Sequence, residues 1–515
     1  MKLLNSVVRE TVRLGKPFRQ SYKEYGYIIQ QKALRRLLEK AKNTAFGKNY
    51  GFTTILNSEN SIECFQQNVP VFNYQSIYDQ WWSKSLKGEK NVCWPGKVKY
   101  FALTSGTSEA SSKRIPITSD QLQSIIRTST NQLLTLSDYS LSKDFYNKSI
   151  LMLGGSTDLV TVDDHFEGDL SGILYSKLPI WFNHFYKPGK KIASEKDWNT
   201  KLDLITKSAK DWDIGIIAGV PAWIQILMEK IVDYYKVQNI HEIWPNLKFF
   251  IHGGVNFEPY RKGFSKYLGE EIYYQETYLA SEGYLAFKNG LKSNGMQLVL
   301  NNGTFFEFVP FNKRNFSPDG CLMNNHETLL LDDVNTVEEY AILISTNAGA
   351  WRYLLGDTIK FTSLENYEIV ITGRTKHFLS LCGEHLSIDN MNKAIQLISN
   401  EFDLDIREYT VAGIPYNNLF AHKWFIGSNK EVDNLSLKQR LDEILMELND
   451  DYKTERKYAL KEIIIEVLPN HLFYKWMKLK GKEGGQNKFP RVLNKQQFEE
   501  WEQFLFNEKR KICWN

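Results

Sequence analysis

One stretch organises this chain: Leu103-Thr104-Ser105-Gly106-Thr107-Ser108-Glu109-Ala110-Ser111-Ser112-Lys113-Arg114-Ile115-Pro116. The apolar run 98–103 before it predicts a buried strand, and the cap residues Thr118-Ser119-Asp120 after it begin a predicted amphipathic helix, 119–136. Small hydroxyl residues and glycine let backbone N–H groups turn toward a phosphate, and Lys113 adds a mobile positive charge. The order strand, loop, helix therefore predicts a phosphate-binding loop.

Two alternatives bear on that prediction. The spacing of P-loop NTPases, G-x-x-x-x-G-K-[ST], is absent, so ordinary P-loop chemistry is disfavoured. Polar turns of this composition are also common at protein surfaces, and on the loop alone a plain Ser- and Thr-rich turn is an equally good explanation. The choice between them depends on the rest of the chain.

The amino-acid composition limits the classes of protein to which this chain could belong. The 515 residues are 42% hydrophobic and 14% aromatic, which indicates a globular protein with room for a large domain and a smaller one. A net charge of +4 argues against a nucleic-acid partner. The five cysteines are scattered without C-x-x-C spacing, as expected of reduced thiols in a cytoplasmic protein.

No targeting or membrane segment is predicted. Charged residues interrupt the start of the sequence before a signal-peptide core could form, and the most apolar window, 214–228, is too short and too glycine-rich to span a membrane. Residues 1 to about 45 are predicted to be helical with a basic outer face, for which simple solvation is preferred over membrane contact. We therefore expect a soluble protein.

From residue 98 onward, predicted strands alternate with predicted helices, which indicates an α/β sheet with helices on both faces. The predicted strands are 98–103, 149–153, 213–218, 247–252 and 271–275, and the predicted helices are 119–136, 222–235 and 259–268. In such sheets ligands bind beyond the carboxyl ends of the strands, where the loops named below would converge.

The pattern changes twice further along the chain. Between about 284 and 361, short alternating strands predict an antiparallel sheet or partial β-barrel packed on the α/β core. Gly373-Arg374-Thr375-Lys376 is the best boundary, so 1–373 are predicted to form a large N-terminal α/β domain and 374–515 a smaller C-terminal α+β domain. The main elements predicted in these two parts are strands 304–310, 340–345, 367–372, 408–413, 421–427 and 462–468, with helices 387–400 and 435–448.

Four more segments carry groups suited to a nucleotide. Gly253-Gly254 ends a strand and lets a flat ligand lie against backbone, although for the pair taken alone a tight turn is the favoured explanation. Tyr278-Leu279-Ala280-Ser281-Glu282 offers a ring for a base, a hydroxyl for a phosphate and a carboxylate for Mg²⁺. Asp357 follows a glycine turn and can accept bonds from ribose hydroxyls, and Arg374 is a planar cation for phosphate or ribose.

In this order, the segments resemble the acyl-adenylate-forming enzymes, and specifically the Gretchen Hagen Three family of acyl acid amido synthetases, also called the auxin-responsive promoter family. The resemblance covers nearly the whole chain. The matching motifs are Thr104-Ser105-Gly106-Thr107-Ser108 with Lys113-Arg114-Ile115-Pro116 for the phosphate loop, Tyr278-Leu279-Ala280-Ser281-Glu282 for Y-G-x-T-E, Tyr353-Leu354-Leu355-Gly356-Asp357 for Y-R-x-G-D, Gly373-Arg374-Thr375-Lys376 for the hinge, and Gln486-Asn487-Lys488-Phe489-Pro490-Arg491 for Q-x-K-x-P-R.

Departures from these motifs, and absences, refine the resemblance. Leu279 replaces a glycine, Ser281 a threonine and Leu354 an arginine of the family patterns. The P-K-G end of the acyl-CoA synthetase phosphate loop and the C-terminal G-K-[IL]-x-R motif are both missing, which favours the amido-synthetase branch.

The resemblance implies an ATP-dependent ligase. It would activate a small carboxylic acid as an acyl-adenylate, release pyrophosphate, and transfer the acyl group to an amine, with an amino acid as the leading candidate, releasing AMP. ATP and Mg²⁺ are the implied cofactors. Two alternatives stay open: transfer to a thiol such as coenzyme A, and a nucleotide-binding protein without catalysis.

The resemblance also implies a role for individual residues. The implied catalytic residues are Lys488, which neutralises the α-phosphate, and Lys113, which holds the β- and γ-phosphates together with Ser105, Gly106, Thr107 and Ser108. The other implied contacts are Gly253, Gly254 and Tyr278 around adenine, Ser281 at the α-phosphate, Glu282 on Mg²⁺, Asp357 on the ribose, and Arg374 on phosphate or ribose.

The acyl pocket has weaker signals. Leu174, Val220, Trp223 and Tyr284 are apolar or aromatic residues on loops or helix starts near the same sheet edge, and an ordinary core role explains them equally well. Three histidines, His165, His252 and His377, are candidates for a general base, but scattered histidines are more often structural, so the sequence predicts that role for none of them.

Overall fold

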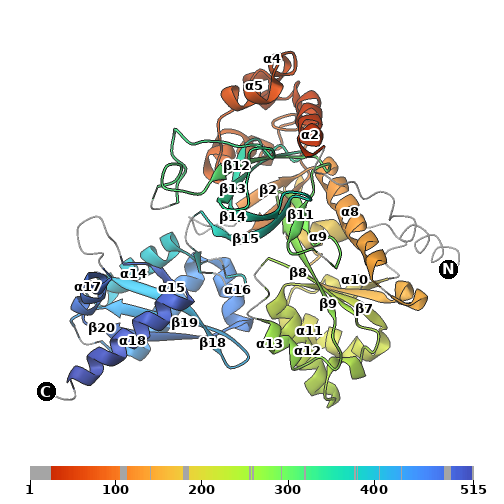
Figure 1. Cartoon of the computed structure of the whole chain (residues 1–515). Coiled ribbons are helices and arrows are strands. Elements are labelled where there is room, and N and C mark those ends of the chain that lie inside the picture. The colour runs from red at the N-terminus through yellow and green to blue at the C-terminus, as the bar shows by residue number, and fades with distance from the viewer. Residues whose placement is uncertain are drawn as a thin grey trace. The chain divides into compact units, whose positions relative to one another are not determined.

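The computed structural model describes residues 25–512 apart from 105–112, 140, 178–184, 255–256, 258–259, 292, 318–319, 376–377, 380, 385, 405, 407, 431 and 481–488 (Figure 1). The described residues up to Thr375 form one compact unit, except for the segment around Tyr260, which belongs with the residues after 375 in a second unit. Each unit has its own sheet and its own core.

In the described part of the first unit, eleven strands form one mixed sheet in the order β12-β13-β14-β15-β11-β10-β9-β8-β7-β3-β6. The strands are β3 (Ser149–Leu153), β6 (Tyr186–Lys187), β7 (Ile214–Gly219), β8 (Phe249–Gly253), β9 (Tyr273–Ala280), β10 (Gly283–Phe287), β11 (Met296–Leu298), β12 (Thr304–Pro310), β13 (Glu339–Thr346), β14 (Tyr353–Ser363) and β15 (Glu368–Arg374). From β6 to β9 neighbouring strands are parallel, and from β9 to β12 they are antiparallel. The α/β class and the antiparallel strands are confirmed, but those strands continue the α/β sheet and do not pack on it as a separate layer.

The segment around the Ser- and Thr-rich loop differs from the prediction. The loop itself, 105–112, lies outside the described residues, but it joins two antiparallel strands, β1 (Tyr100–Thr104) and β2 (Lys113–Ile117). With β4 (Val160–Val162) and β5 (His165–Gly168) they form a separate sheet in the order β2-β1-β5-β4. The predicted order strand, loop, helix was therefore wrong. A five-residue strand containing proline is tolerated at a sheet edge and has little sequence signature of its own.

The helix after this hairpin, α8 (Ser119–Leu134), begins where the cap residues predicted. The Thr118 side chain accepts a hydrogen bond from the Gln121 N–H and so satisfies one of the first backbone donors. The remaining α-helices of the first unit are α2 (Gly26–Ala41), α3 (Ala45–Asn49), α4 (Phe52–Leu56), α5 (Ser61–Asn68), α6 (Tyr74–Ile77), α7 (Ser83–Leu86), α9 (Leu170–Tyr175), α10 (Lys190–Ala193), α11 (Trp198–Ser208) and α12 (Pro221–Tyr235). The helix predicted over 259–268 is only α13 (Arg261–Ser265).

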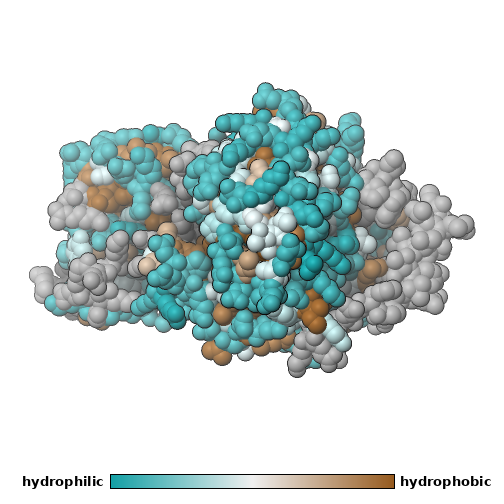
Figure 2. Space-filling model, turned by 90° about the horizontal axis from the view of Figure 1, so that it is seen from above, coloured by the Kyte–Doolittle hydropathy of each residue, from teal (hydrophilic) through white to brown (hydrophobic). Residues whose placement is uncertain are grey.

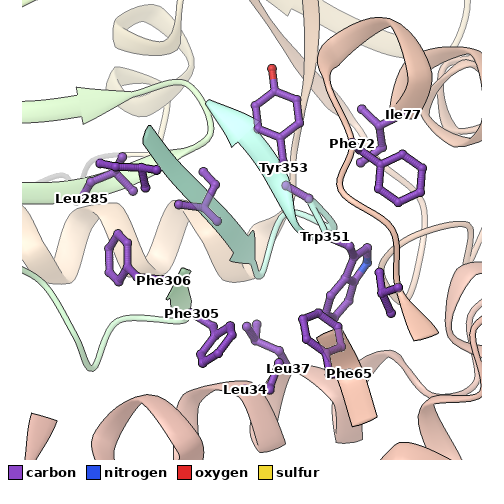
Figure 3. Packing of buried hydrophobic residues seen from close by; sticks show 14 of the residues in the cluster. Leu34, Leu37, Phe65, Phe72, Ile77, Leu285, Phe305, Phe306, Trp351 and Tyr353 are labelled. Atoms are coloured by element: carbon purple, nitrogen blue, oxygen red, sulfur yellow. The ribbon is translucent and has the colours of Figure 1, made fainter. Parts of the chain in front are cut away.

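An aromatic core lies between α2, α5 and the β12–β14 strands (Figure 3). Trp351 is fully buried, and its ring lies 4.7 Å from Phe52 and 6.4 Å from Phe65 between centroids. Leu34 and Leu37 of α2 belong to the same cluster. Trp351 lies two residues before β14, so this packing fixes the start of the strand that leads to Asp357.

The second unit contains the sheet β20-β19-β18-β21. Its elements are β16 (Phe378–Leu379), β17 (Leu386–Ser387), α14 (Ile388–Glu401), β18 (Tyr409–Tyr416), β19 (Leu419–Gly427), α15 (Asn434–Leu448), α16 (Asp450–Tyr458), β20 (Leu460–Leu468), α17 (Asn470–Leu479), β21 (Val492–Leu493) and α18 (Lys495–Ile512). The predicted α+β class is confirmed, whereas α16 and the two-residue β21 were not predicted. Phe489 is buried against Trp501 and Phe473, so the chain is anchored one residue after Lys488.

Two sequence expectations concern the chain as a whole. None of the helices formed by the described residues is both long and apolar enough to cross a membrane. Cys64, Cys93, Cys321 and Cys382, the cysteines that the structure describes, are all free thiols.

Candidate functional site

Asp357 is the centre of a buried polar group formed by three strands. Its Oδ2 accepts a hydrogen bond from the Tyr278 hydroxyl of β9 at 2.6 Å, and its Oδ1 pairs with Nε of Arg374 at 2.7 Å. Asp357 and Arg374 face each other across the β14–β15 ladder, so the sheet register itself sets this pair. Burial and the neighbouring Asp357 carboxylate raise the pKa of Tyr278 well above its ordinary value, which keeps the hydroxyl a donor.

Gly356 shapes the approach to Asp357. It adopts φ +92°, a left-handed conformation that favours glycine, and its carbonyl accepts the Thr375 N–H at 2.8 Å. No atom lies within 4 Å of where a Cβ would project, so the glycine is required by backbone conformation and not by crowding. The turn predicted before Asp357 is therefore a local irregularity inside β14.

Glu282 lies beside this group and is 8% exposed. Its carboxylate accepts a hydrogen bond from the Tyr353 hydroxyl. Burial raises the pKa of Glu282, and the positive charge of Lys113 together with the Tyr353 bond opposes that rise. Glu282 is thus a buried carboxyl group with a raised pKa, with a tyrosine hydroxyl and a lysine as its neighbours.

Lys113 approaches Glu282 from the small sheet. Its Nζ lies 5.2 Å from the centroid of the Tyr74 ring, a cation–π geometry, and burial raises the pKa of Tyr74 to about 12. The Tyr74 hydroxyl accepts the Arg114 N–H at 2.9 Å. The β1–β2 hairpin and the start of α6 therefore meet beside Glu282 of the large sheet.

The predicted loop 278–282 is held from outside by α8. The Gln121 side chain donates through Nε2 to the carbonyl of Ser281 at 2.8 Å and is itself 1% exposed. Tyr278 was predicted to follow a strand, but β9 continues through Ala280, so Tyr278 lies within the strand and Ser281 and Glu282 form the turn to β10. A turn fixed by a buried amide is suited to presenting a hydroxyl and a carboxylate together.

The paired glycines allow close packing at the end of β8. A Cβ on Gly253 would come 2.5 Å from the carbonyl oxygen of Thr277, and Gly254 has φ +85°. A Cβ added to Gly254 would lie 3.9 Å from Cγ2 of Val220, which is ordinary van der Waals contact. The close approach of β8 and β9 at Gly253 accounts for that glycine without a ligand, and its predicted adenine contact stays a prediction.

The structure brings together some of the predicted residues and not others. Lys113, Tyr278, Glu282, Asp357 and Arg374 form one electrostatically linked group. The phosphate-loop residues Ser105, Gly106, Thr107 and Ser108, with Lys488 and His377, lie outside the described residues.

The four acyl-pocket candidates separate into different surroundings. Leu174 packs on a cluster that contains the buried Tyr284, whose hydroxyl donates to Gln132 Oε1 at 2.5 Å. Val220 precedes α12 beside Gly254, and Trp223 packs on Trp198 of α11 with 4.4 Å between ring centroids. Leu174 and Tyr284 are therefore the pair that the packing groups together.

Two histidines have structural surroundings. His165 is buried, and its Nε2 lies 3.2 Å from the Glu167 carboxylate, which also pairs with Nε of Arg114 at 2.7 Å. His252 is buried and stacks on Phe257 at 4.7 Å. Neither histidine is placed as a base for an incoming amine, in line with the choice to assign none.

Sequence reasoning missed Tyr353, Tyr74 and Gln121. Tyr353 lies inside a quoted motif, so its proximity to Asp357 was a usable signal. Tyr74 is brought close by a backbone bridge between Phe72 and Tyr353, and Gln121 by the packing of α8. Contacts between residues so far apart in the sequence have no local signature.

The donor set suits a hard divalent cation that is shared with a substrate. Within the described ranges, no three His, Cys, Asp or Glu side chains gather as a metal site of their own. Mg²⁺ is usually held by one or two carboxylates together with substrate phosphates and water. Glu282, a single buried carboxylate raised in pKa by burial, fits that requirement.

Comparisons with known proteins complete the description. Three family models match this chain: the GH3 family N-terminal domain over residues 18–209, the central domain over 297–374, and the C-terminal domain over 389–497. A jasmonoyl–L-amino acid synthetase, JAR6 of Nicotiana attenuata, is 23% identical over 440 residues, which cover 72% of each protein. The indole-3-acetic acid-amido synthetase GH3.2 of Arabidopsis thaliana is 26% identical over 173 residues, 32% of this chain and 31% of that protein.

Solved structures share the fold. AtGH3.15 acyl acid amido synthetase in complex with 2,4-DB aligns with a TM-score of 0.58 at 17% identity, over 97% of this chain and 96% of that one. A 2-hydroxyisobutyryl-CoA ligase in complex with 2-HIB-AMP and CoA aligns with a TM-score of 0.56 at 12% identity, over 94% and 92%. At these identities the likeness shows the fold alone.

Proposed function

The chain belongs to the GH3 family, and from this premise we propose how its residues divide the reaction. It is an acyl acid amido synthetase, a ligase that activates a carboxylic acid as an acyl-adenylate and transfers the acyl group to an amino acid. ATP is the activating substrate and AMP a product. We propose that the acid is small and that the protein acts in the cytoplasm.

The chemistry has two steps. A carboxylate oxygen of the acid attacks the α-phosphorus of ATP, the bond from that phosphorus to the β-phosphate bridging oxygen breaks, and pyrophosphate leaves. The amine nitrogen then attacks the acyl carbon, the bond to the AMP oxygen breaks, and the amine proton passes to water. Both steps concentrate charge on phosphate oxygens, so positioned cations and donors matter more than a covalent nucleophile.

The polar group of the first unit supports the nucleotide roles. We propose that Asp357 accepts the ribose hydroxyls, because Arg374 and Tyr278 already hold its carboxylate in one orientation. Ser281 is proposed to donate to the α-phosphate from the turn that Gln121 fixes. Mg²⁺ bound by Glu282 would neutralise charge on the phosphates, and Tyr353 holds that carboxylate in place by its hydrogen bond.

The two lysines are proposed to act on the phosphates. Lys113, already beside Glu282, holds the β- and γ-phosphates with Ser105, Gly106, Thr107 and Ser108. Lys488 neutralises the α-phosphate, and a compact, hydrated cation on a long side chain suits a group that arrives when a domain closes.

The observation that supports these roles best is the shared electrostatic environment of Tyr278, Glu282, Asp357 and Arg374. These residues come from three separate motifs, and packing places them within reach of one another's charge. Asp357, Glu282, Tyr278 and Tyr353 are buried beside the partly exposed Arg374. Ionisable groups with shifted pKa values that gather in one place are typical of functional sites.

The test is acid-dependent exchange of labelled pyrophosphate into ATP, followed by mass spectrometry of products formed with amino acids or with coenzyme A. We expect exchange with some members of a broad acid panel and amides as products. The Lys488→Ala variant should lose exchange, whereas Lys461→Ala, an exposed lysine of the same unit, should keep it. Absence of exchange with every acid, or full exchange by Lys488→Ala, would contradict the corresponding assignment.

A further inference from the structure

The basic face of α2 borders a cavity. Lys32, Arg36 and Lys40 follow one another at intervals of four residues, so they lie along one side of the helix. The cavity beside them measures about 360 Å³ and is lined also by Ile29, Ala33, Leu37, Trp94, Asp120, Asn301, Gly303 and Asn347. The residues of the catalytic group described above are not among its walls. Solvation, preferred for this face on sequence grounds, does not account for a hollow with apolar walls.

The cavity has an excess of positive charge. Nζ of Lys40 lies 3.4 Å from Oδ2 of Asp120, which also accepts the Trp94 indole N–H at 2.8 Å. For Lys32 and Arg36, the described part of the chain offers no carboxylate within ion-pair distance. Because Asp120 offsets Lys40, two cations one helical turn apart remain to face an incoming anion.

The apolar residues that line the cavity indicate that the anion also has an apolar part. Ala33 and Leu37 are buried beneath the cations, and the Trp94 side chain is 6% exposed at the same cavity. Figure 2 looks down on the helices at the top of Figure 1 and shows a largely hydrophilic face with small hydrophobic areas. A volume above about 300 Å³ is enough for a small organic ligand. The amides of Asn301 and Asn347 add polar groups to the lining.

We propose that this cavity is a second ligand site, which binds an organic dianion with an apolar body, such as an aryl phosphate. Lys32 and Arg36 contact the charged end, and Ile29, Leu37 and Trp94 contact the apolar end. The site lies against the first turn of α8, where Asp120 faces the cavity and the next residue, Gln121, holds the Ser281 carbonyl. The inference concerns binding and does not depend on the ligase reaction.

Isothermal titration of the full chain with phenyl phosphate at pH 8 tests the proposal, because at that pH the phosphate is above its second pKa of about 6. Inorganic phosphate and benzyl alcohol serve as probes that lack the apolar body or the charge. We expect phenyl phosphate to bind more tightly than either. Lys32→Gln and Arg36→Gln should each weaken it by at least about tenfold, the effect of losing a charge-assisted contact.

Arg35→Gln is the matched control, because Arg35 is exposed on the same helix and does not line the cavity. It should leave the affinity unchanged, and thermal melting of the three variants should coincide if all are folded. Saturating AMP separates this site from the proposed nucleotide site and should leave binding of phenyl phosphate intact. Displacement by AMP, equal affinity in Arg35→Gln and Arg36→Gln, or no binding to the wild-type chain would each overturn the proposal.

Discussion

At the scale of single residues, Glu282 occupies a position that favours its proposed chemistry over stability. It is buried, and burial raises its pKa above the ordinary value, so the folded chain favours its protonated form. A group with a raised folded-state pKa loses stability as pH increases from its unfolded pKa through its folded one. At neutral pH the ionised carboxylate is therefore a cost to folding, which the proposed Mg²⁺ would offset when bound.

Replacing Glu282 separates these two effects. Glu282→Gln keeps the shape and removes the buried charge, so we expect adenylation to fall by at least about a hundredfold. Thermal melting at pH 7.5 should occur at the same or a higher temperature than in the wild type. Glu365→Gln, at an exposed position, is the control and should change neither quantity. A large loss of melting temperature with Glu282→Gln would show that this carboxylate is structural.

A second buried ion pair has a stabilising role in the first unit. Arg352 is 5% exposed, and its guanidinium contacts the fully buried Glu307 with NH2 to Oε1 at 3.0 Å. NH1 of Arg352 also donates to the carbonyls of Gln66 and Val69, both at 2.8 Å. Arg352 adopts φ +41°, so this network also holds the strained residue that precedes the Tyr353 strand.

Removing one partner of this pair should be costly. We expect Glu307→Gln to lower the free energy of unfolding by about 3–5 kcal/mol, because Arg352 would remain buried without its carboxylate. Urea denaturation followed by tryptophan fluorescence measures the change. Glu338→Gln, on the exposed turn before β13, supplies the comparison and should lie close to wild type. Equal midpoints for both variants would refute the structural role of the pair.

At the scale of elements, the β1–β2 hairpin and α8 present the loop 105–112 and the turn at Ser281. Thr118 joins them, since its side chain accepts the Gln121 N–H and its hydroxyl donates to the Asn347 carbonyl at 2.6 Å. Asn347 in turn donates to Ser124 Oγ at 2.7 Å. The start of α8 is therefore tied to the end of β13 as well as to β2.

Loss of the Thr118 cap should destabilise the start of α8. We expect Thr118→Ala to lower the free energy of unfolding by about 1–2 kcal/mol, through the lost cap and the lost bond to Asn347. Ser119→Ala, one residue on and exposed, should change stability by less than about 0.5 kcal/mol. Denaturant titration of both proteins measures the difference, and equal stabilities would show that Thr118 contributes no cap.

The helices and strands also show which features of the fold can be predicted from the sequence. Strands with a continuous apolar run, such as β3 and β12, were predicted with the bounds that the structure has. The apolar residues within each segment are enough to indicate that it is buried. Strand β2 was missed because five residues with a proline become a strand only through their partner β1. The motif residues Asp357, Glu282 and Arg374 were found by pattern. The pairing of Asp357 with Arg374 and of Glu282 with Tyr353 depends on sheet register and packing, which no short window of sequence contains.

At the scale of the whole molecule, a buried pair makes the stability of the second unit depend on pH. In the second unit, Glu384 and His422 are both fully buried, with Glu384 Oε1 at 2.9 Å from His422 Nε2. Burial alone would raise the pKa of Glu384, but the bond and charge of His422 and the Cys382 N–H lower it to about 2. A depressed folded-state pKa stabilises the fold above the unfolded pKa, and that stability is lost as pH falls from about 4.5 toward 2.

The pair therefore predicts an acid-sensitive second unit. We expect Glu384→Gln to be much less stable than wild type at pH 7, and the gap between the two proteins to narrow as pH falls below 4.5. Chemical denaturation at pH 7, at pH 4.5 and at the lowest pH where both chains stay folded measures the gap. A gap that stays constant with pH would mean that the ionisation of Glu384 contributes nothing to folding.

The central claim is that the acid reacts at the α-phosphorus of ATP. A carboxylic acid substrate labelled with ¹⁸O in its carboxylate tests this most directly, because the attacking oxygen stays on that phosphorus when the amide forms. We predict that AMP isolated after turnover with an amino acid contains one heavy oxygen for each amide produced, as read by mass spectrometry. Heavy oxygen in inorganic phosphate, or AMP without label alongside labelled amide, would contradict the acyl-adenylate route.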